Sequence, residues 1–363
     1  MTKAMTTSST ASPALQGNGS SRRFAVMMWL LVAVMLLLAV ANLLIGAVEI
    51  PPIEVLSILS GKVSDNYAWQ VIVTETRLPM IATAALAGAA LAVSGLLLQT
   101  VFANPLADPS ILGVSTGSGL GVAIVMLAFG GSIGTVFGTT LGGYVSILLG
   151  AMLGAALVLL ALLMFSMFVK SATMLLIIGI MVSYLASSAI SFLNFFSTEA
   201  GVHSYVIWGL GNFSGVTLQQ LPIMAIPVLL ALISTMLLVK PLNAMLLGSR
   251  YAENLGVNIR RVRNELLIIT GVLTAVVTAF CGPIGFIGLI VPHIARLLLR
   301  TSNHNRLIPA TILAGIDIAL LCTFISVLPT SVGVMPINAI TPVIGVPIII
   351  YIILNRKRIF YFN

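Results

Sequence analysis

Apolar runs of about 20 residues or more, each long enough to cross a membrane, follow one another along most of this chain. Of its 363 residues, 59% are hydrophobic and only 7% are charged, which lies far outside the range of soluble proteins. Because the hydrocarbon core of a membrane offers no hydrogen bonds to the backbone, a chain crosses it only as helices or as a closed barrel. The runs therefore predict an all-α integral membrane protein.

About ten spans are expected. The apolar run 265–299 is too long for one span, and Cys281-Gly282-Pro283 and Gly285 interrupt it, so we divide it into a full helix and a shorter one. The expected spans are 24–48, 78–102, 111–129, one within 133–168, 174–196, 218–239, the two parts of 265–299, 307–328 and 337–354. We expect an exposed loop with short interfacial segments at 49–69 and a polar loop with aromatic residues at 197–217.

Basic residues indicate the orientation of these spans. Ten spans place both termini on one side, and with the N-terminus inside, all of the 17 lysines and arginines except Lys62 and Arg77 face the inner side. Because basic residues are retained on the cytoplasmic side, we expect both termini in the cytoplasm. This bias explains the net charge of +8 without nucleic acid, and no nucleic-acid partner is expected.

The chain divides into one large domain and two tails. Residues 1–21 are rich in Ser, Thr, Ala and Gly and are expected to form a disordered cytoplasmic tail. Residues 22–356 form the predicted transmembrane domain, which contains a cytoplasmic segment at 240–263, and residues 357–363 form a short cytoplasmic tail. The apolar run after Arg22 and Arg23 is too long for a cleavable signal and is interpreted as the first span.

The segment 240–263, called the coupling segment below, concentrates polar residues between two apolar runs. Its six charged residues are Lys240, Arg250, Glu253, Arg260, Arg261 and Arg263. Ser249 can cap a short helix, Gly256 can end that helix in a left-handed conformation, and Asn258 can cap a second one. Two readings remain open: an ordinary basic loop, or two short helices hinged at Gly256 that receive motion from a soluble partner.

Polar residues at membrane depth are few. Asp317 lies inside a late span, where a carboxyl group suggests a proton or ion relay. No basic residue lies within a helical turn of it, so a packed or protonated carboxyl bonded to backbone or to Ser/Thr is favoured. A secondary transporter would need ionisable groups at the membrane midplane, and Asp317 is nearly alone there.

Catalytic and metal sites are not indicated. His293 has no second His, Asp or Glu at a spacing that would complete a metal site or a nucleophilic pair, which disfavours an intramembrane enzyme. Cys281 and Cys322 show no metal-binding spacing. The chain also lacks the GxxxxGK[ST] phosphate-binding loop, so ATP, if it drives this protein, binds to another chain.

Small residues recur at helical spacing inside the spans. Gly117 and Gly121 form one GxxxG pair, and Gly150 and Gly154 form another. A special helix interface is one interpretation. Ordinary close packing, in which small residues let two backbones approach, is the favoured one.

Two motifs and the coupling segment resemble a known family. The first motif runs from Gly88 to Ser115 and contains Asn104-Pro105-Leu106-Ala107-Asp108-Pro109. The second motif is Gly282-Pro283-Ile284-Gly285-Phe286-Ile287-Gly288-Leu289-Ile290-Val291-Pro292-His293-Ile294-Ala295-Arg296, and Leu255-Gly256-Val257-Asn258 lies in the coupling segment. Together they resemble the permeases for iron-siderophore, haem and cobalamin uptake, which are membrane subunits of type II ABC importers.

The resemblance, which covers about residues 69–354, implies a ten-helix permease fold and a set of partners. These are a second permease copy or paralogue, two ATP-binding subunits, an extracytoplasmic substrate-binding protein and the lipids of a bacterial cytoplasmic (inner) membrane. It implies a transport subunit rather than an enzyme: the chain itself binds no cofactor, and the partner ATPase uses ATP and Mg. The substrate expected is an iron-siderophore, with haem or cobalamin as the alternative and a secondary transporter as the rival class.

The resemblance also assigns residues to roles. Contact with the ATPase is assigned to Ser249, Arg250, Tyr251, Ala252, Glu253, Leu255, Gly256, Val257 and Asn258. The family motifs and the translocation pathway comprise Gly88, Ser94, Gly95, Gln99, Asn104, Pro105, Asp108, Pro109, Gly282, Pro283, Gly285, Phe286, Gly288, Pro292, His293 and Arg296. Arg77 is assigned to docking of the binding protein, and no metal ligand is assigned.

The chain departs from the family at charged positions. The usual Arg-Leu-Pro-Arg ends here in Met80, and Val327 and Val334 stand where the family has an arginine and a glutamate. Two of the arginines that meet acidic residues of the binding protein are therefore missing. The mode of docking, and whether the second permease is identical, stay open.

Overall fold

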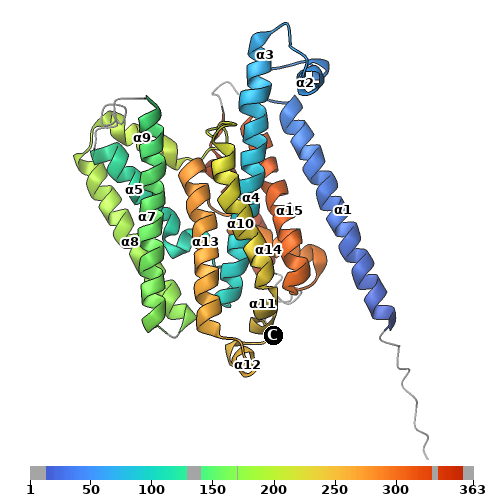
Figure 1. The fold of residues 1–363 in the computed structure, drawn as a ribbon, viewed down its shortest axis with the longest axis vertical. Coiled ribbons are helices and arrows are strands. Elements are labelled where there is room, and N and C mark those ends of the chain that lie inside the picture. Colours follow the sequence, from blue (N-terminus) through green and yellow to red (C-terminus); the bar gives the residue numbers. More distant parts are fainter. Residues whose placement is uncertain (1–13, 129–139, 170, 329–333, 355–363) are drawn as a thin grey trace, which may run out of the picture.

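The computed structural model describes residues 14–128, 140–169, 171–328 and 334–354. Within these ranges every regular element is a helix, and there is no strand. Figure 1 shows long helices running side by side. The elements before the first gap are α1 (Ala14–Leu44), α2 (Pro52–Leu59), α3 (Tyr67–Val71), the π-helical turn η1 (Ile72–Arg77), α4 (Leu78–Val101), the 3-10 turn η2 (Pro109–Leu112), α5 (Val114–Ala123) and the π-helical turn η3 (Ile124–Ala128).

The second part of the chain supplies the remaining helices. They are α7 (Thr140–Phe168), α8 (Ala172–Phe196), α9 (Glu199–Gly209), α10 (Leu221–Leu237), α11 (Val239–Met245), α12 (Ser249–Asn254), α13 (Ile259–Cys281), α14 (Ile287–Leu299), α15 (His304–Ser326) and α16 (Ile337–Leu354). Among the described residues, six helices are long and apolar enough to cross a membrane, and a seventh span results if α10 and α11, which meet at 59°, are one broken span. Three shorter apolar helices lie at Val114–Ala128, Ile287–Leu299 and Ile337–Ile352, so the count of ten stays a prediction.

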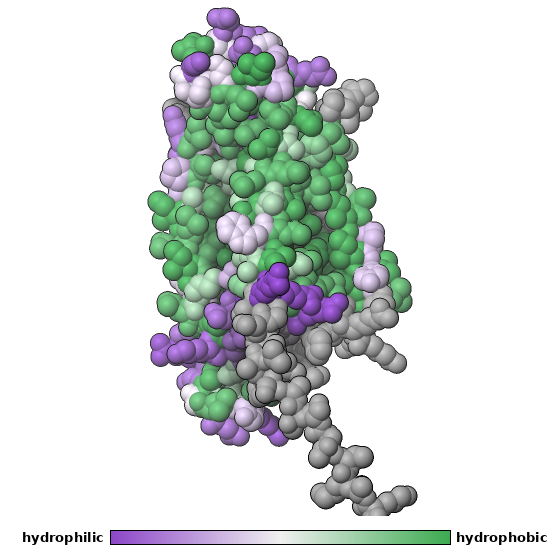
Figure 2. Space-filling model, turned by 90° about the vertical axis from the view of Figure 1, so that its right-hand side faces the viewer, coloured by the Kyte–Doolittle hydropathy of each residue, from purple (hydrophilic) through white to green (hydrophobic). Residues whose placement is uncertain are grey.

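Apolar side chains cover the middle of one face of the bundle (Figure 2). Figure 2 shows hydrophobic side chains over the middle of the face that carries α1, with hydrophilic residues gathered toward the two ends. Of the candidate spans in the described residues, those of α4 and α13 are the most enclosed. In their 18-residue apolar stretches 78% and 72% of the residues are buried, against 6% in α1. The helices that carry the start of the first motif and the end of the coupling segment therefore form the centre, and α1 lies at the edge.

Three boundaries differ from the sequence prediction. Helix α1 begins at Ala14, inside the predicted tail, because helix propagation outward from the apolar span adds a hydrogen bond per residue; residues 1–13 lie outside the described part. The second span begins at Tyr67 rather than at residue 78. Pro79 has no N–H to donate, and the π-helical turn η1 accommodates the missing hydrogen bond, so the helix extends upstream of this proline. The expected loop 197–217 contains α9, which Thr198 caps by accepting a hydrogen bond from the N–H of Gly201.

Glycines mark the closest helix contacts. A Cβ built on Gly121 would lie 1.8 Å from the carbonyl oxygen of Gly150, and one on Gly154 would lie 2.0 Å from that of Gly117. The two GxxxG pairs thus face each other across α5 and α7, which confirms the interpretation as ordinary close packing. Gly88 of α4 meets Gly315 of α15 in the same way.

Candidate coupling segment and motif junction

The coupling segment forms one end of the bundle. Helix α12 projects beyond the other helices, at the end where α1 begins, and α2 and α3 lie at the opposite end (Figure 1). Gly256 has φ +83°, so it ends α12 in the left-handed conformation that the sequence predicts. Ser249 is not the cap that we expect: α12 already begins at Ser249, and Gly248, with φ +97°, stands at the cap position without a side chain.

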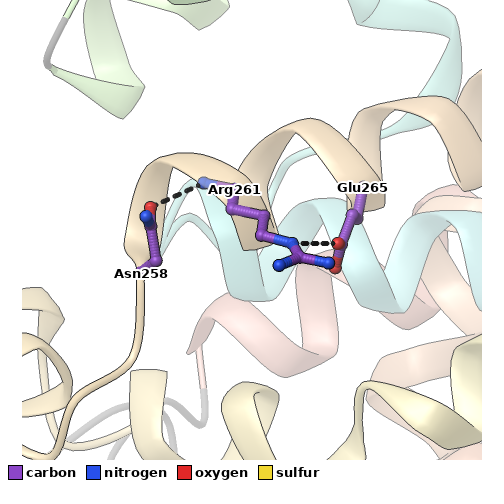
Figure 3. Close-up of polar contacts among 3 residues, drawn as sticks. All are labelled: Asn258, Arg261 and Glu265. Carbon is purple, nitrogen blue, oxygen red and sulfur yellow. Dashed lines mark hydrogen bonds and ion pairs between the residues drawn. The ribbon is translucent and has the colours of Figure 1, made fainter.

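Beyond Gly256 the chain enters a long helix. The side chain of Asn258 accepts a hydrogen bond of 3.0 Å from the N–H of Arg261, which confirms the predicted cap (Figure 3). Arg261 and Glu265 form an exposed ion pair of 2.9 Å one turn further on. The expected second short helix is therefore wrong, because its residues are the first turns of α13, which continues to Cys281. The hinge at Gly256 joins α12 directly to a central span.

Helix α12 presents apolar surface away from the bundle. Ala252 is fully buried, whereas Tyr251 and Leu255 are 52% and 58% exposed. Arg250 and Glu253 are also exposed. An aromatic and an aliphatic side chain are thus exposed among charged residues on a protruding helix and its cap, a composition that protein-binding surfaces share.

The two motifs meet inside the bundle. A Cβ on Gly95 would lie 1.9 Å from the carbonyl oxygen of Gly288, so α4 and α14 are in backbone contact. Pro292 stands four residues after Gly288 and has no N–H to donate to the Gly288 carbonyl oxygen. This oxygen therefore has no helical hydrogen bond from Pro292 and faces α4. Pro109 packs on Gly288 from a third direction, where a Cβ would lie 2.7 Å from its Cδ. We call this three-way contact the motif junction.

Polar bonds extend the motif junction toward the α12 end. Arg296 donates to Oε1 of Gln99 at 2.6 Å, and Nε2 of Gln99 donates to the carbonyl of Leu289 at 3.2 Å. Nε2 of His293 lies 2.8 Å from the carbonyl oxygen of Pro105, so this nitrogen carries a proton. Arg296 and His293 are 5% and 1% exposed. The bonds hold the chain after α4 against α14.

The remaining predicted motif residues shape turns around these contacts. Asn104 and Asp108 accept hydrogen bonds from backbone N–H groups two residues ahead, as turn-forming side chains do. Ser94 bonds Thr274 on α13 at 3.2 Å. Gly282 has φ +75° and Phe286, which precedes α14, has φ +70°. Pro283 and Gly285 are held by Asn338 of α16, a contact that sequence reasoning missed.

Arg77 does not lie where a docking residue should. Its side chain is 4% exposed, and its guanidinium donates to the carbonyl oxygens of Leu43, Leu44 and Val48. These carbonyls end α1 and begin the following loop, so Arg77 fastens the outer part of α1 to η1. The geometry argues against the predicted docking role, because it leaves no exposed guanidinium for a partner. Met80 and Val327 are buried as well, and Val334 is exposed.

Asp317 also differs from expectation. It is 7% exposed, and neither carboxyl oxygen has a hydrogen-bond partner among the described residues. The predicted bonds to backbone or to Ser/Thr are therefore not formed.

Replacing Arg77 by methionine should weaken the attachment of α1. Hydrogen bonds from a charged donor contribute about 1.5–3 kcal/mol each, so we expect a clear fall in the melting temperature of the detergent-solubilised chain. Lys62→Met, at an exposed site of the same end, is the matched control and should leave it unchanged. An unchanged melting temperature for Arg77→Met, with a salt-dependent loss of binding-protein association, would support the docking role instead.

Comparison with known proteins identifies the family of the chain. The model of the FecCD transport family matches residues 31–355. The vitamin B12 import system permease protein BtuC of Klebsiella pneumoniae is 36% identical over 338 residues, which cover 93% of this chain and 95% of that protein. The protein of the same name from Salmonella typhi is 37% identical over 295 residues, covering 80% of this chain and 85% of that one.

A solved structure agrees with these relatives. It is described as an inward-facing conformation of a metal-chelate type ABC transporter, and it matches 92% of this chain and 99% of its own with a TM-score of 0.76 and 30% identity. The family, the relatives and the fold lead to one assignment. The chain belongs to the FecCD transport family and is the multi-pass permease subunit of an ABC importer.

Proposed function

We propose that this chain carries a metal chelate across a bacterial cytoplasmic membrane and that partner ATPase subunits drive it through α12. The observation that carries the proposal is the exposed surface of Tyr251 and Leu255 on a short helix, joined by the Gly256 hinge to the central span α13. Because α13 is mostly buried, we expect it to move as a near-rigid body when α12 is displaced.

The distribution of charge supports this orientation. The α12 end of the bundle carries Lys240 of α11, Arg250 of α12, Arg260 and Arg261 at the start of α13, and Arg300 after α14, whereas the opposite end carries Lys62 and Arg77. Basic residues favour the cytoplasmic side, so α12 faces the cytoplasm and α2 and α3 face outward. In the proposed assembly, two ATPase subunits use ATP and Mg, a second permease completes the pathway, and a binding protein delivers the substrate.

The substrate is the finer part of the proposal. The sequence motifs are common to permeases for iron-siderophore, haem and cobalamin, and the iron-siderophore is the substrate that we propose first, with haem or cobalamin as the alternative. Cobalamin is the second candidate, since the relatives at 36% and 37% identity are named vitamin B12 import permeases. Both are metal chelates, the class named for the solved structure.

Uptake by proteoliposomes that contain the chain, its ATPase and its binding protein tests the proposal. We expect import of labelled ferric siderophore or labelled cobalamin that requires ATP on the α12 side. Collapse of the proton gradient should have little effect, and Asp317→Asn should retain most uptake, because ATP supplies the energy. Loss of uptake in both treatments would favour a proton-driven carrier, and uptake of neither chelate would contradict the proposed substrate class.

A further inference from the structure

A buried polar cluster joins the coupling segment to two central helices. His304, the first residue of α15, is 0% exposed. Its Nδ1 lies 3.0 Å from Oδ1 of Asn243 on α11, and its Nε2 lies 2.9 Å from the hydroxyl of Thr100 on α4. The backbone N–H of His304 also donates to Oδ1 of Asn243, at 2.8 Å. We call these three residues the histidine bridge.

The surrounding bonds fix the orientation of the histidine bridge. Nδ2 of Asn243 donates to Asn303 at 3.0 Å, so the amide oxygen is the atom that faces His304. That oxygen only accepts, and Nδ1 of His304 therefore carries a proton. The imidazole lies at a helix N-terminus, where a positive charge is disfavoured, so the ring is neutral and its Nε2 is an acceptor that faces the Thr100 hydroxyl. That hydroxyl also lies 2.9 Å from the carbonyl oxygen of Leu96, so its one proton is shared between these two acceptors. The amide of Asn243 and the ring of His304 therefore have defined orientations.

The bridge begins in the coupling segment and ends beside the motif junction. Asn243 lies on α11, which follows the 59° bend after α10 and precedes α12. Thr100 is the neighbour of Gln99, whose amide binds Arg296 of α14. The path runs from Asn243 to His304 and on to Thr100 by hydrogen bonds, and from Thr100 to Gln99 along the backbone. The hydrogen bond between Gln99 and Arg296 then completes the link from the coupling segment to the second motif.

The other flank of the coupling segment is held elsewhere. Arg263, near the start of α13, is 4% exposed and donates to the carbonyl oxygens of Ser166 and Val169 at the end of α7. A displaced α12 therefore acts on α7 through α13 and on α4 through α11. Helix α13 also contacts α4, the most enclosed span, through Thr274 and Ser94, and the histidine bridge is the hydrogen-bonded contact between α4 and the α11 side of the coupling segment.

We propose that Asn243, His304 and Thr100 are positioning residues that transmit displacement of the coupling segment to the inner end of α4. This inference rests on the proposed function, since it assigns a route to the motion that the ATPase supplies. Loss of the bridge should leave ATP hydrolysis in place while less substrate is moved for each ATP hydrolysed.

The test compares two substitutions at Thr100 in the reconstituted importer with its ATPase and binding protein. Thr100→Val keeps the shape of the side chain and removes the hydroxyl, whereas Thr100→Ser keeps the hydroxyl. We expect Thr100→Val to lower the substrate imported per ATP hydrolysed about fivefold, the scale set by one lost hydrogen bond. Thr100→Ser should retain most of the wild-type ratio, which a role in packing alone would not predict.

Asn243→Ala removes the bridge from its other end and should lower the same ratio, whereas Asn305→Ala, an exposed asparagine of α15, should not. If the importer that carries Asn243→Ala does not assemble, the result for the nearly isosteric Thr100→Val decides the test. If the wild-type complex imports the chelate and Thr100→Val moves as much substrate per ATP hydrolysed as the wild type does, the proposed role of the histidine bridge is wrong and the proposed function stands. A wild-type complex that hydrolyses ATP without import would instead contradict the proposed function.

Discussion

Gly95→Ala should strongly destabilise the protein, although it adds only one methyl group. The added Cβ would lie 1.9 Å from the carbonyl oxygen and 2.5 Å from the carbonyl carbon of Gly288. Both atoms belong to the backbone of α14, so no side chain can rotate away, and α4 and α14 must separate. Overpacking costs about 1–3 kcal/mol where side chains adjust, and we expect this backbone clash to reach or exceed that range.

The measurement is the melting temperature and the monodisperse fraction of the detergent-solubilised chain. Gly209→Ala is the matched control, since Gly209 is also a helical glycine and has nothing within 4 Å of its Cβ position. Gly209→Ala should behave like the wild type. If Gly95→Ala melts within a degree or two of the control, the close contact between the two motifs does not exist.

Gly256→Val should abolish most transport while leaving the protein inserted. Gly256 has φ +83° and nothing within 4 Å of its Cβ position, so the substitution meets no neighbour and strains only the backbone. A side chain in the left-handed region costs about 1–2 kcal/mol, and more for a β-branched one. The hinge between α12 and α13 is expected to change its angle, which displaces the surface of Tyr251 and Leu255.

The readouts are the amount of ATPase that co-purifies and the rate of chelate uptake, both of which should fall. Gly215→Val is the control, because Gly215 has the same open surroundings without a left-handed φ. Uptake of Gly256→Val at the wild-type rate would show that the hinge is not used for coupling.

Local signals predict part of this structure. Hydrophobic length reveals the spans, and the left-handed Gly256 and the Asn258 cap are readable because a few neighbouring residues determine each of them. The same reasoning fails at Ser249, where Gly248 already turns the chain and α12 starts one residue early. It also fails for α9, whose capping residue Thr198 lies in a stretch too polar to suggest a helix.

Contacts between distant residues could not be predicted. His304 meets Asn243 and Thr100, which are 61 and 204 residues away, and no spacing rule connects them. Arg77 is assigned to docking by the family resemblance, yet the helix continues through it and its side chain bonds to the end of α1. Gly288 and Pro292 are recognisable as a motif, but the contact of that carbonyl with Gly95 appears only in the fold.

The central claim is that the ATPase docks on α12, and site-specific crosslinking tests it most directly. Cys281 and Cys322, both buried, are first replaced by alanine. Single cysteines are then placed at Glu253 on α12 and at Asp65 before α3, two exposed acidic positions at opposite ends of the bundle. With a short bifunctional thiol reagent and the assembled importer, position 253 should form an adduct with the ATPase and position 65 should not. An ATPase adduct at position 65 without one at position 253 would contradict the account.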